Sequence, residues 1–315
     1  MRIAALMEPK RFELLERPEP AIGPDEVDVR VASCGVCASE LDIWSGLAGH
    51  ASYPWYPGHE VSGTVERIGG EVTHLAPGDP VAAWITTHGF ADRVAVKAAY
   101  CFPAGAVPLD LALGEPLACA VNAVEAADVR FGDDVVIVGG GFMGHLVHKL
   151  VELRGPRQTI VADTRDDALR RAGSFGATAT VNVLRDSLED VVLQRTAGVG
   201  ADITFEVTGV QAALESLAGA TRMSGTVVIA GYHQGEPRRI PLGEWNWKAF
   251  HVVNAHFRDV AIILRGMEMG MRLLTSGRIS MGGLVTHRFP LNQIDDAFRT
   301  AVAKPDGFVK ATVHP

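Results

Sequence analysis

Hydrophobic and polar positions divide this chain into two regions with different patterns. In residues 1–114, short apolar runs are separated by Pro and Gly, and Val27, Val29 and Val31 alternate with charged or small residues. Closely spaced segments that alternate in this way are typical of an all-β region. From residue 115 to 283, apolar β-branched runs alternate with segments of helical length. That pattern predicts right-handed crossovers and an α/β fold with a doubly wound parallel sheet.

The second region gives its clearest signal between residues 135 and 163. Residues 135–138 form an apolar, β-branched run, as expected for a strand buried on both faces, and residues 159–162 form another. We expect a helix between them and further helices at 166–175, 186–196 and 259–276. Further strands are predicted at 180–182, 203–207, 225–230 and 252–254.

A glycine-rich turn follows the first of these strands. Gly139, Gly141 and Gly144 supply the pattern G-x-G-x-x-G. In such a motif the first glycine permits a tight turn, the second lets backbone approach a pyrophosphate, and the third allows close helix–strand packing. The following helix N-terminus offers N–H groups and a positive dipole end to phosphates. We therefore assign Gly139, Gly141, Phe142, Met143 and Gly144 to a dinucleotide site.

An acidic residue follows the second strand, about twenty residues beyond the last glycine. In that position, the carboxylate of Asp163 suits a ribose 2′-hydroxyl and repels a 2′-phosphate, which favours NAD over NADP. Thr164 and Arg165 complete the predicted ribose site. An arginine at this place is also able to accept a 2′-phosphate, so NADP remains the alternative.

The first region contains side chains of the types that bind zinc. Cys37 lies in CGVCASE, and His59 and Glu60 lie in PGHE. A catalytic zinc uses three thiolate, imidazole or carboxylate ligands and keeps one position open. Taken singly, Cys37 is better interpreted as a small buried apolar residue, and His59 as a structural histidine.

Five motifs in a fixed order support a more specific interpretation. They are C-x-x-C-x-S-E around residue 37, G-H-E at 58–60, P-G-D at 77–79, E-P-L at 115–117 and the glycine turn from 139. Together they resemble the medium-chain zinc-dependent alcohol and polyol dehydrogenases, which include sorbitol and threonine dehydrogenases. The resemblance extends over essentially the whole chain. It implies a mainly β, GroES-like catalytic domain at 1–120 and 284–315, and a Rossmann NAD-binding domain at 121–283.

The resemblance also implies roles for residues of the first region. Cys37 and His59 match zinc ligands, and a further ligand would come from Glu60 or Glu115. Ser39 matches the position whose hydroxyl relays the substrate proton, and Asp42 stands where a histidine commonly ends that relay. For Ser39, the alternative is a serine in an ordinary turn. For Asp42, the alternative is a carboxylate that accepts the proton with a different pH dependence.

Further positions match cofactor contacts of the family. Val207, Thr208, Gly231 and Asn254 correspond to backbone that lines the nicotinamide, and Lys310 corresponds to a cation that meets the pyrophosphate. Ordinary strand-end turns and a solvated lysine are the alternatives. His256, close to Asn254, is a weaker candidate for a substrate contact.

Two departures from the family pattern concern zinc. Glu40 stands where the family usually has an aspartate that supports the zinc-binding histidine. The family commonly inserts a lobe with four closely spaced cysteines that hold a structural zinc, whereas here no such lobe is present and Cys101 stands alone. We therefore expect one catalytic zinc per subunit and no structural zinc.

Composition narrows the possible partners. The net charge of −8 argues against a nucleic-acid or anionic-membrane partner, and no run of 18 apolar residues exists to span a membrane. The beginning of the chain lacks the pattern of a signal peptide, and a chain of this length does not need disulfides from its four cysteines. We expect a cytoplasmic enzyme with a small-molecule substrate, and the family resemblance implies a homodimer or homotetramer.

These observations predict a zinc-dependent, NAD-linked dehydrogenase that interconverts a secondary alcohol and a ketone. Polyol, sugar, cyclitol and amino-alcohol substrates are all compatible with the sequence. The alternatives are a zinc-free quinone or enoyl reductase of the same superfamily, and a non-catalytic sensor that binds NAD(H). Candidate walls of the substrate pocket are Trp44, Trp84, Ile85 and His88.

Overall fold

The computed structural model describes residues 1–47 and 52–315. Contacts group them into two compact units, residues 1–118 with 263–315, and residues 119–262. The second boundary lies earlier than position 283, where the sequence interpretation put it, because most of helix α8 (Val260–Thr275) packs with the first unit. Cβ atoms built at Gly114 and Gly270 would lie 2.9 Å from Met267 and 2.8 Å from Leu117, so these glycines allow α8 to approach the chain around Gly114 and Leu117 closely.

The second unit is built on a six-stranded sheet in which every strand pair is parallel. The strand order is β10-β9-β8-β11-β12-β13, so the direction of winding reverses between β8 and β11. This order confirms the predicted doubly wound sheet, and ligands of such sheets bind at the carboxyl ends of the strands beside that reversal. The strands are β8 (Asp134–Val138), β9 (Gln158–Asp163), β10 (Ala179–Asn182), β11 (Ala201–Glu206), β12 (Thr221–Ile229) and β13 (His251–Asn254).

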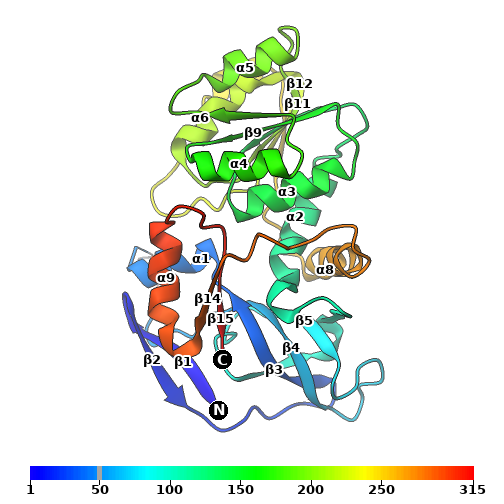
Figure 1. The fold of residues 1–315 in the computed structure, drawn as a ribbon, viewed down its shortest axis with the longest axis vertical. Helices are drawn as coiled ribbons and strands as arrows, with labels where there is room; N and C mark the ends of the chain where they lie inside the picture. Colours follow the sequence, from blue (N-terminus) through cyan, green and yellow to red (C-terminus); the bar gives the residue numbers. More distant parts are fainter. Residues whose placement is uncertain (48–51) are drawn as a thin grey trace. The chain divides into compact units, whose positions relative to one another are not determined.

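Helices cover both faces of this sheet, with α3 and α4 on one side and α5 and α6 on the other (Figure 1). Strand residues such as Val136, Ile160 and Val181 pack in one cluster with Leu188 of α5 and Leu217 of α6. A parallel sheet buried in this way needs the nearly continuous apolar strands that the sequence contains. The helices are α2 (Gly114–Ala126), which enters this unit, α3 (Phe142–Glu152), α4 (Asp166–Ser174), α5 (Leu188–Arg195), α6 (Gln211–Ala220) and α7 (Leu242–Trp247).

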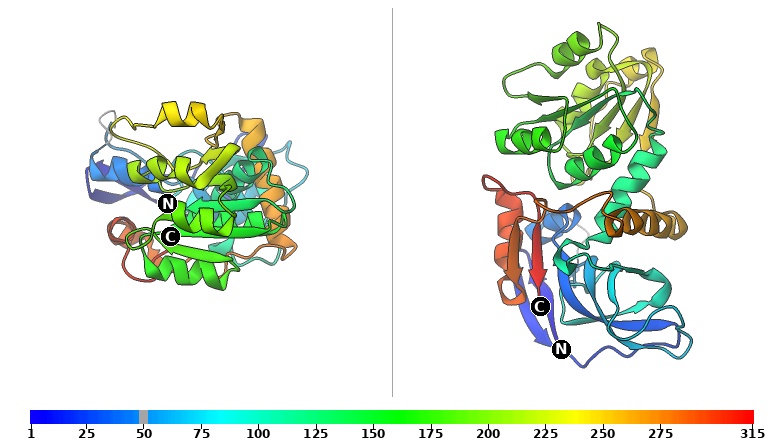
Figure 2. Two further views of the ribbon diagram at one scale, coloured as in Figure 1. Left: turned by 90° about the horizontal axis from the view of Figure 1, so that it is seen from above. Right: turned by 45° about the vertical axis from the view of Figure 1, so that its right-hand side comes forward.

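The first unit is mainly β. Its larger sheet has the order β14-β15-β3-β4-β5-β7, with β6 also paired to β3, and β1 pairs with β2 in a separate ribbon. The ends of the chain meet here, because β15 from the C-terminal segment pairs with β3, as the ribbon views show (Figure 2). The elements are β1 (Arg2–Glu8), β2 (Arg11–Glu16), β3 (Glu26–Gly35), α1 (Ala38–Ser45), β4 (Glu60–Ile68), β5 (Pro80–Trp84), β6 (Arg93–Lys97), β7 (Cys101–Pro103), β14 (His287–Pro290), α9 (Ile294–Ala303) and β15 (Ala311–His314).

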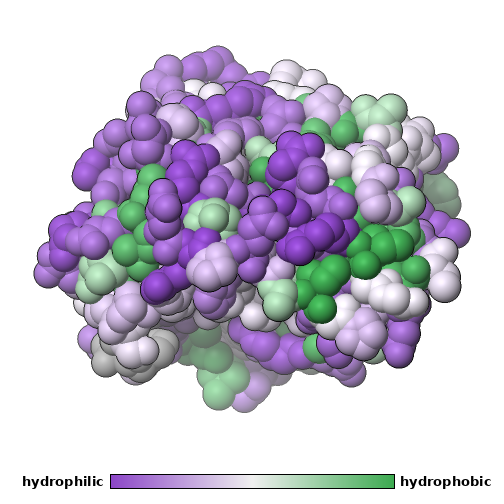
Figure 3. Space-filling view, turned by 90° about the horizontal axis from the view of Figure 1, so that it is seen from below, coloured by the Kyte–Doolittle hydropathy of each residue, from purple (hydrophilic) through white to green (hydrophobic). Residues whose placement is uncertain are grey.

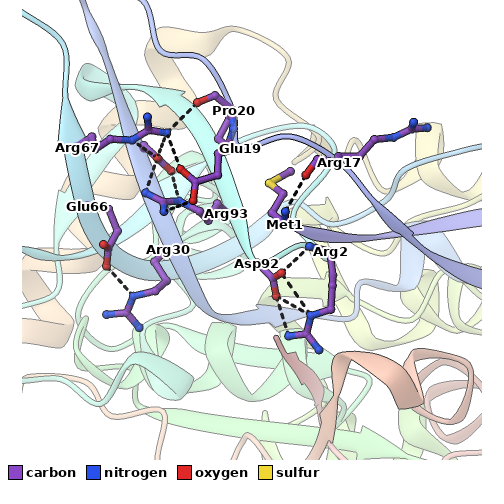
Figure 4. Close-up of polar contacts among 11 residues, drawn as sticks. Met1, Arg2, Arg17, Glu19, Pro20, Arg30, Glu66, Arg67, Asp92 and Arg93 are labelled. Carbon is purple, nitrogen blue, oxygen red and sulfur yellow. Dashed lines mark hydrogen bonds and ion pairs between the residues drawn. The ribbon is translucent and has the colours of Figure 1, made fainter.

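Strand β3 departs from the half-buried alternation that the sequence suggests. Asp28 lies between two core valines but is itself 0% exposed. Its carboxylate accepts hydrogen bonds from Arg67 on β4 and Arg93 on β6, and Glu19 pairs with both arginines (Figure 4). The two guanidinium groups satisfy the buried carboxylate, so a charged residue is accommodated where the pattern predicts an exposed one.

Within residues 1–47 and 52–315, no helix combines the length and the apolar character needed to cross a membrane. On the face drawn in Figure 3, hydrophilic residues predominate and apolar residues gather in a few small groups.

Candidate functional site

The first unit brings three predicted zinc-ligand side chains together. Cys37 lies at the N-cap of α1, Glu60 is the first residue of β4, and His59 directly precedes that strand. One potential ligand atom from each side chain lies within 4.8 Å of the other two. Thiolate, imidazole and carboxylate at such distances match the donor set of a catalytic zinc site with one open position.

Glu40 holds the three-residue cluster in place from the first turn of α1. Its side chain is 2% exposed, and its Oε1 accepts the backbone N–H of Gly58 at 2.7 Å and lies 3.0 Å from Nδ1 of His59. Because a carboxylate only accepts, Nδ1 carries the proton and Nε2 keeps a lone pair for a metal ion. Glu40 therefore takes the supporting role that the family usually gives to aspartate.

The electrostatics around His59 favour a cation. Burial lowers the pKa of His59, but the Glu40 carboxylate and Cys37 outweigh it and raise that pKa well above its usual value. An imidazole surrounded by negative groups is a good position for a divalent ion, because the ion replaces the proton that these groups attract.

Lys310, predicted as a cation for the pyrophosphate, pairs with Glu60 of this cluster. Its Nζ donates to Oε1 of Glu60 at 2.6 Å, with the two side chains 7% and 1% exposed. Burial lowers the pKa of Lys310, but Glu60 and Cys37 raise it more, so the amine is held charged. A Cβ at Gly35 would lie 1.9 Å from Oε2 of Glu60, so only glycine leaves room for the pair.

The second oxygen of Glu60 is the clearest sign of a missing partner. Oε2 is buried and has no hydrogen-bond partner among the residues that the structure describes. Buried polar atoms are nearly always satisfied, so an orphaned carboxylate oxygen beside Cys37 and His59 fits a metal ion. The residues present therefore fit zinc, held by Cys37, His59 and Glu60.

The other residues predicted for this centre lie at different distances from it. The hydroxyl of Ser39 donates to Sγ of Cys37 at 3.2 Å, which places it at the cluster. Asp42 follows three residues later on the same helix, and the two therefore share one helix face. Glu115, in the first turn of α2, is not one of the three clustered ligands, although its charge is close enough to raise the pKa of Lys310.

Neither Cys101 nor any of the predicted pocket walls belongs to the three-residue cluster. Burial raises the pKa of the Cys101 thiol to about 12, which suits a core residue and not a metal ligand. Trp44 is 4% exposed and packs on Phe298, so it is part of the core and the interpretation of it as a pocket wall is wrong. Trp84, Ile85 and His88 line an open hollow of about 460 Å³ whose lining includes none of the three clustered ligands.

In the second unit, the glycine turn has the geometry that phosphate binding requires. Gly139 has φ +117°, and a Cβ there would lie 2.7 Å from Cγ2 of Thr208. A Cβ at Gly144 would lie 1.8 Å from the carbonyl oxygen of Gly139, so the helix can follow the turn this closely only with glycine. Gly141 is the N-cap of α3, and Phe142 and Met143 begin the helix, whose first turn points its backbone N–H groups towards the glycine turn.

Asp163 ends β9 beside this turn. Its carboxylate accepts the backbone N–H groups of Gly140 at 2.7 Å and Arg165 at 2.8 Å. The guanidinium of Arg165 lies 3.9 Å from Asp163 and 3.7 Å from Asp167, so its charge is largely offset by two acids. Thr164, between them, accepts a hydrogen bond from Asn182 at its carbonyl. The site therefore fits a dinucleotide whose ribose approaches Asp163.

The predicted nicotinamide contacts lie at the carboxyl ends of the next three strands. Val207 and Thr208 follow β11, Gly231 follows β12, and Asn254 ends β13, where its side chain accepts the N–H of His256 at 3.2 Å. The buried Glu206, which precedes this row, was not among the predicted site residues, because its role depends on a contact with His233 in the loop after β12 that the sequence does not show.

Comparison with known proteins gives the family. Models of the alcohol dehydrogenase GroES-like domain and of the zinc-binding dehydrogenase domain match residues 23–106 and 143–268. Sorbitol dehydrogenase of Gallus gallus is 31% identical over 331 residues, which cover 92% of this chain and 90% of the relative. The chain belongs to the zinc-binding alcohol and polyol dehydrogenases. This confirms the family resemblance, the α/β fold with a GroES-like unit, and the prediction of an oxidoreductase.

Solved structures agree with the assignment to this dehydrogenase family. A zinc-binding dehydrogenase of Sinorhizobium meliloti 1021, solved with NADP, superposes with a TM-score of 0.85 at 26% identity and covers 100% of this chain and 99% of that one. Galactitol-1-phosphate dehydrogenase of Escherichia coli superposes with a TM-score of 0.89 at 23% identity over 100% of both chains, which supports the fold alone. The dehydrogenase is thus a zinc-dependent, NAD(P)-linked enzyme of the alcohol or polyol type.

Proposed function

We propose that this dehydrogenase oxidises a secondary alcohol of the polyol, sugar, cyclitol or amino-alcohol class to a ketone, and the reverse, with NAD(H). The observation that supports this most directly is the cluster of Cys37, His59 and Glu60 with its buried, unsatisfied Oε2. The name of its 31% identical relative, a sorbitol dehydrogenase, favours a substrate with several hydroxyl groups.

The chain's own residues would divide the chemistry as follows. Cys37, His59 and Glu60 would hold one zinc ion, which would supply a Lewis acid for the substrate oxygen and so favour loss of the alcohol proton. Glu40 keeps His59 in the tautomer that leaves Nε2 available. The hydroxyl of Ser39, next to Cys37, takes the alcohol proton, and Asp42 on the same helix face is the proposed next acceptor.

The cofactor half of the proposal favours NAD over NADP. Asp163 offers a carboxylate for a ribose 2′-hydroxyl, while Arg165, the residue best placed to attract a 2′-phosphate, already faces two acids. The pyrophosphate would bind the N–H groups at the start of α3, and the nicotinamide would lie along Val207, Thr208, Gly231 and Asn254. A nicotinamide held there would supply the acceptor for the hydride that leaves the carbinol carbon.

We further propose that the dehydrogenase is a cytoplasmic homodimer or homotetramer. Strand β13 is the last strand of the cofactor sheet. Val252 in this strand is 46% exposed, and Trp247, four residues before the strand, is 78% exposed. An exposed strand edge with apolar side chains favours pairing with a second copy, which is how family members often associate.

Two measurements test the metal half of this proposal. Elemental analysis of the purified dehydrogenase should give one zinc per chain, and turnover with a panel of polyols should require it. Cys37→Ser should lose most of the zinc and nearly all turnover but keep NADH binding, because the dinucleotide site belongs to the other unit. Cys101→Ser is the matched control and should keep both zinc and turnover.

Three outcomes would contradict the proposal. Two zinc ions per chain would overturn the single-site interpretation. Full activity of the metal-free protein would move it to the zinc-free quinone or enoyl reductases. NADH binding without turnover on any alcohol or ketone would favour the sensor.

A further inference from the structure

Gly231 lies against a buried carboxylate at the end of the cofactor sheet. Its backbone N–H donates to the carbonyl of Glu206 at 2.8 Å. A Cβ at Gly231 would lie 2.3 Å from Oε2 of Glu206 and 2.3 Å from the backbone nitrogen of Gly209. The turns after β11 and β12 are therefore packed directly on each other through the side chain of Glu206, which is 0% exposed.

Glu206 divides its two oxygens between these turns. Oε1 accepts the backbone N–H groups of Thr208 at 2.6 Å and Gly209 at 2.8 Å. Oε2 lies 2.8 Å from Nε2 of His233, which belongs to the loop after β12. One carboxylate thus connects the Thr208 turn to the Gly231–His233 segment.

Arg238 completes a chain of three side chains. Its Nε donates to Nδ1 of His233 at 3.3 Å, and its guanidinium also donates to the carbonyls of Gly209 at 3.3 Å and Gln234 at 2.9 Å. Because arginine is only a donor, Nδ1 of His233 is the acceptor and Nε2 carries the proton given to Glu206. Arg238 therefore donates to His233, and His233 donates to Glu206.

The other side of Gly231 is also held. Nε2 of His256 lies 2.9 Å from the carbonyl oxygen of Gly231. Burial lowers the pKa of His256, so its imidazole is neutral near pH 7, and Nε2–H donates to that carbonyl. His233 therefore holds the backbone at Gly231 through Glu206, and His256 holds it directly.

We propose that Glu206, His233 and Arg238 form a clamp that positions the backbone of Thr208 and Gly231 for the nicotinamide end of the cofactor. None of the three side chains needs to touch the reacting atoms, so they are positioning residues. The proposal rests on the function proposed above, because it assumes that a dinucleotide lies along this edge.

The strand order supports the assignment to the nicotinamide end. The carboxyl ends of β9, β8, β11 and β12 lie in a row, with Asp163 at one end, the glycine turn next, and Thr208 and Gly231 beyond it. Thr208 packs on Gly139, which joins the clamp to the phosphate turn. A dinucleotide with its adenosine ribose at Asp163 therefore extends towards the clamp with its nicotinamide half.

The test compares binding of the whole cofactor with binding of its adenosine half. In His233→Leu, which removes both hydrogen bonds of the imidazole, the Kd of NADH should rise at least tenfold, about 1.4 kcal/mol. The Kd of AMP should change less than about twofold, because β8 separates Asp163 at the end of β9 from the clamp, which begins at the end of β11. In His233→Gln, which offers a donor to Glu206 and an acceptor to Arg238, NADH affinity should be largely restored.

Adjacent arginines provide the matched control. Arg238→Met should weaken NADH binding as His233→Leu does, whereas Arg239→Met removes the same charge from an exposed neighbour and should have little effect. If His233→Leu fails to fold, Arg238→Met can still be compared with Arg239→Met, and its NADH binding with its AMP binding.

Several results would overturn the clamp. They are an unchanged Kd for NADH in folded His233→Leu and Arg238→Met, equal weakening of NADH and AMP, or equal effects of the two arginine substitutions. A wild-type protein that binds no NADH at all would instead refute the proposed function.

Discussion

Replacement of Lys310 by methionine distinguishes two roles for one residue. The sequence suggests a cation for the cofactor pyrophosphate, whereas the structure buries Nζ at 2.6 Å from Glu60 in the zinc-ligand cluster. Methionine keeps most of the apolar stem and removes the charge. The substitution should therefore destabilise the metal-free dehydrogenase and leave NADH binding unchanged.

The size of the effect follows from burial. With the two side chains 7% and 1% exposed, loss of the ammonium group leaves a buried carboxylate without its cation. Breaking such a pair from one side costs about 3–5 kcal/mol. Protonating a glutamate with the usual pKa at pH 8 costs about 5 kcal/mol. Because proton uptake would remove the unpaired charge, this cost is an upper bound on the destabilisation caused by the substitution.

Urea unfolding of the zinc-free protein at pH 8 measures this loss, and fluorescence titration measures the Kd of NADH. Lys304→Met is the control, since that lysine is exposed in the same C-terminal segment and should change stability by less than about 1 kcal/mol. Added zinc should recover much of the lost stability, because the ion neutralises the same carboxylate.

The opposite pattern would refute this reasoning. If Lys310→Met weakened NADH binding tenfold or more while the free energy of unfolding stayed within 1 kcal/mol of wild type, the pyrophosphate role would be correct. The pair with Glu60 would then have no energetic importance.

Three further predictions concern the cofactor, the proton and pH. Asp163→Ser should lower the ratio of NAD to NADP catalytic efficiency at least tenfold, about 1.4 kcal/mol, in steady-state assays, and an unchanged ratio would refute the role of Asp163. Ser39→Ala should keep the zinc found by elemental analysis but slow turnover on the order of 100-fold; full activity would exclude Ser39 from the relay. The ring nitrogens of His145 and His148 on α3 are buried and have no hydrogen-bond partner among the described residues, and burial lowers the pKa of His145 to about 3. Since the unfolded chain takes up this proton below about pH 6.5 and the folded chain does not, stability should fall between pH 6.5 and 3, by about 2 kcal/mol at pH 5 from His145 alone. Urea unfolding of His145→Leu at pH 7 and pH 5 should show a correspondingly smaller loss, and an identical loss would contradict this origin.

The local features of the cofactor unit follow directly from the sequence. A buried parallel strand needs an apolar run, a phosphate turn needs glycine, and an acid after the second strand meets a ribose, so each signal lies within about thirty consecutive residues. The predicted strands of this unit and helices α3, α4 and α5 therefore match those of the structure to within a few residues, whereas α6 and α7 were not predicted.

Contacts between distant segments were decided only by the tertiary structure. Asp28 looks like an exposed residue in an alternating strand, but Arg67 and Arg93 from two other strands make its burial possible. Lys310 looks like a cofactor contact, but the pairing of β15 with β3 brings it to Glu60, 250 positions earlier in the chain.

The candidate metal centre shows both contributions. The sequence supplies Cys37, His59 and two acidic candidates, because ligand chemistry depends on residue type. It does not choose between Glu60 and Glu115, because the distance between side chains on separate elements depends on how those elements pack. The fold brings Glu60 to Cys37 and His59 and leaves one of its oxygens unsatisfied. Residue types thus determine which ion the protein can bind, and long-range packing determines which side chains bind it.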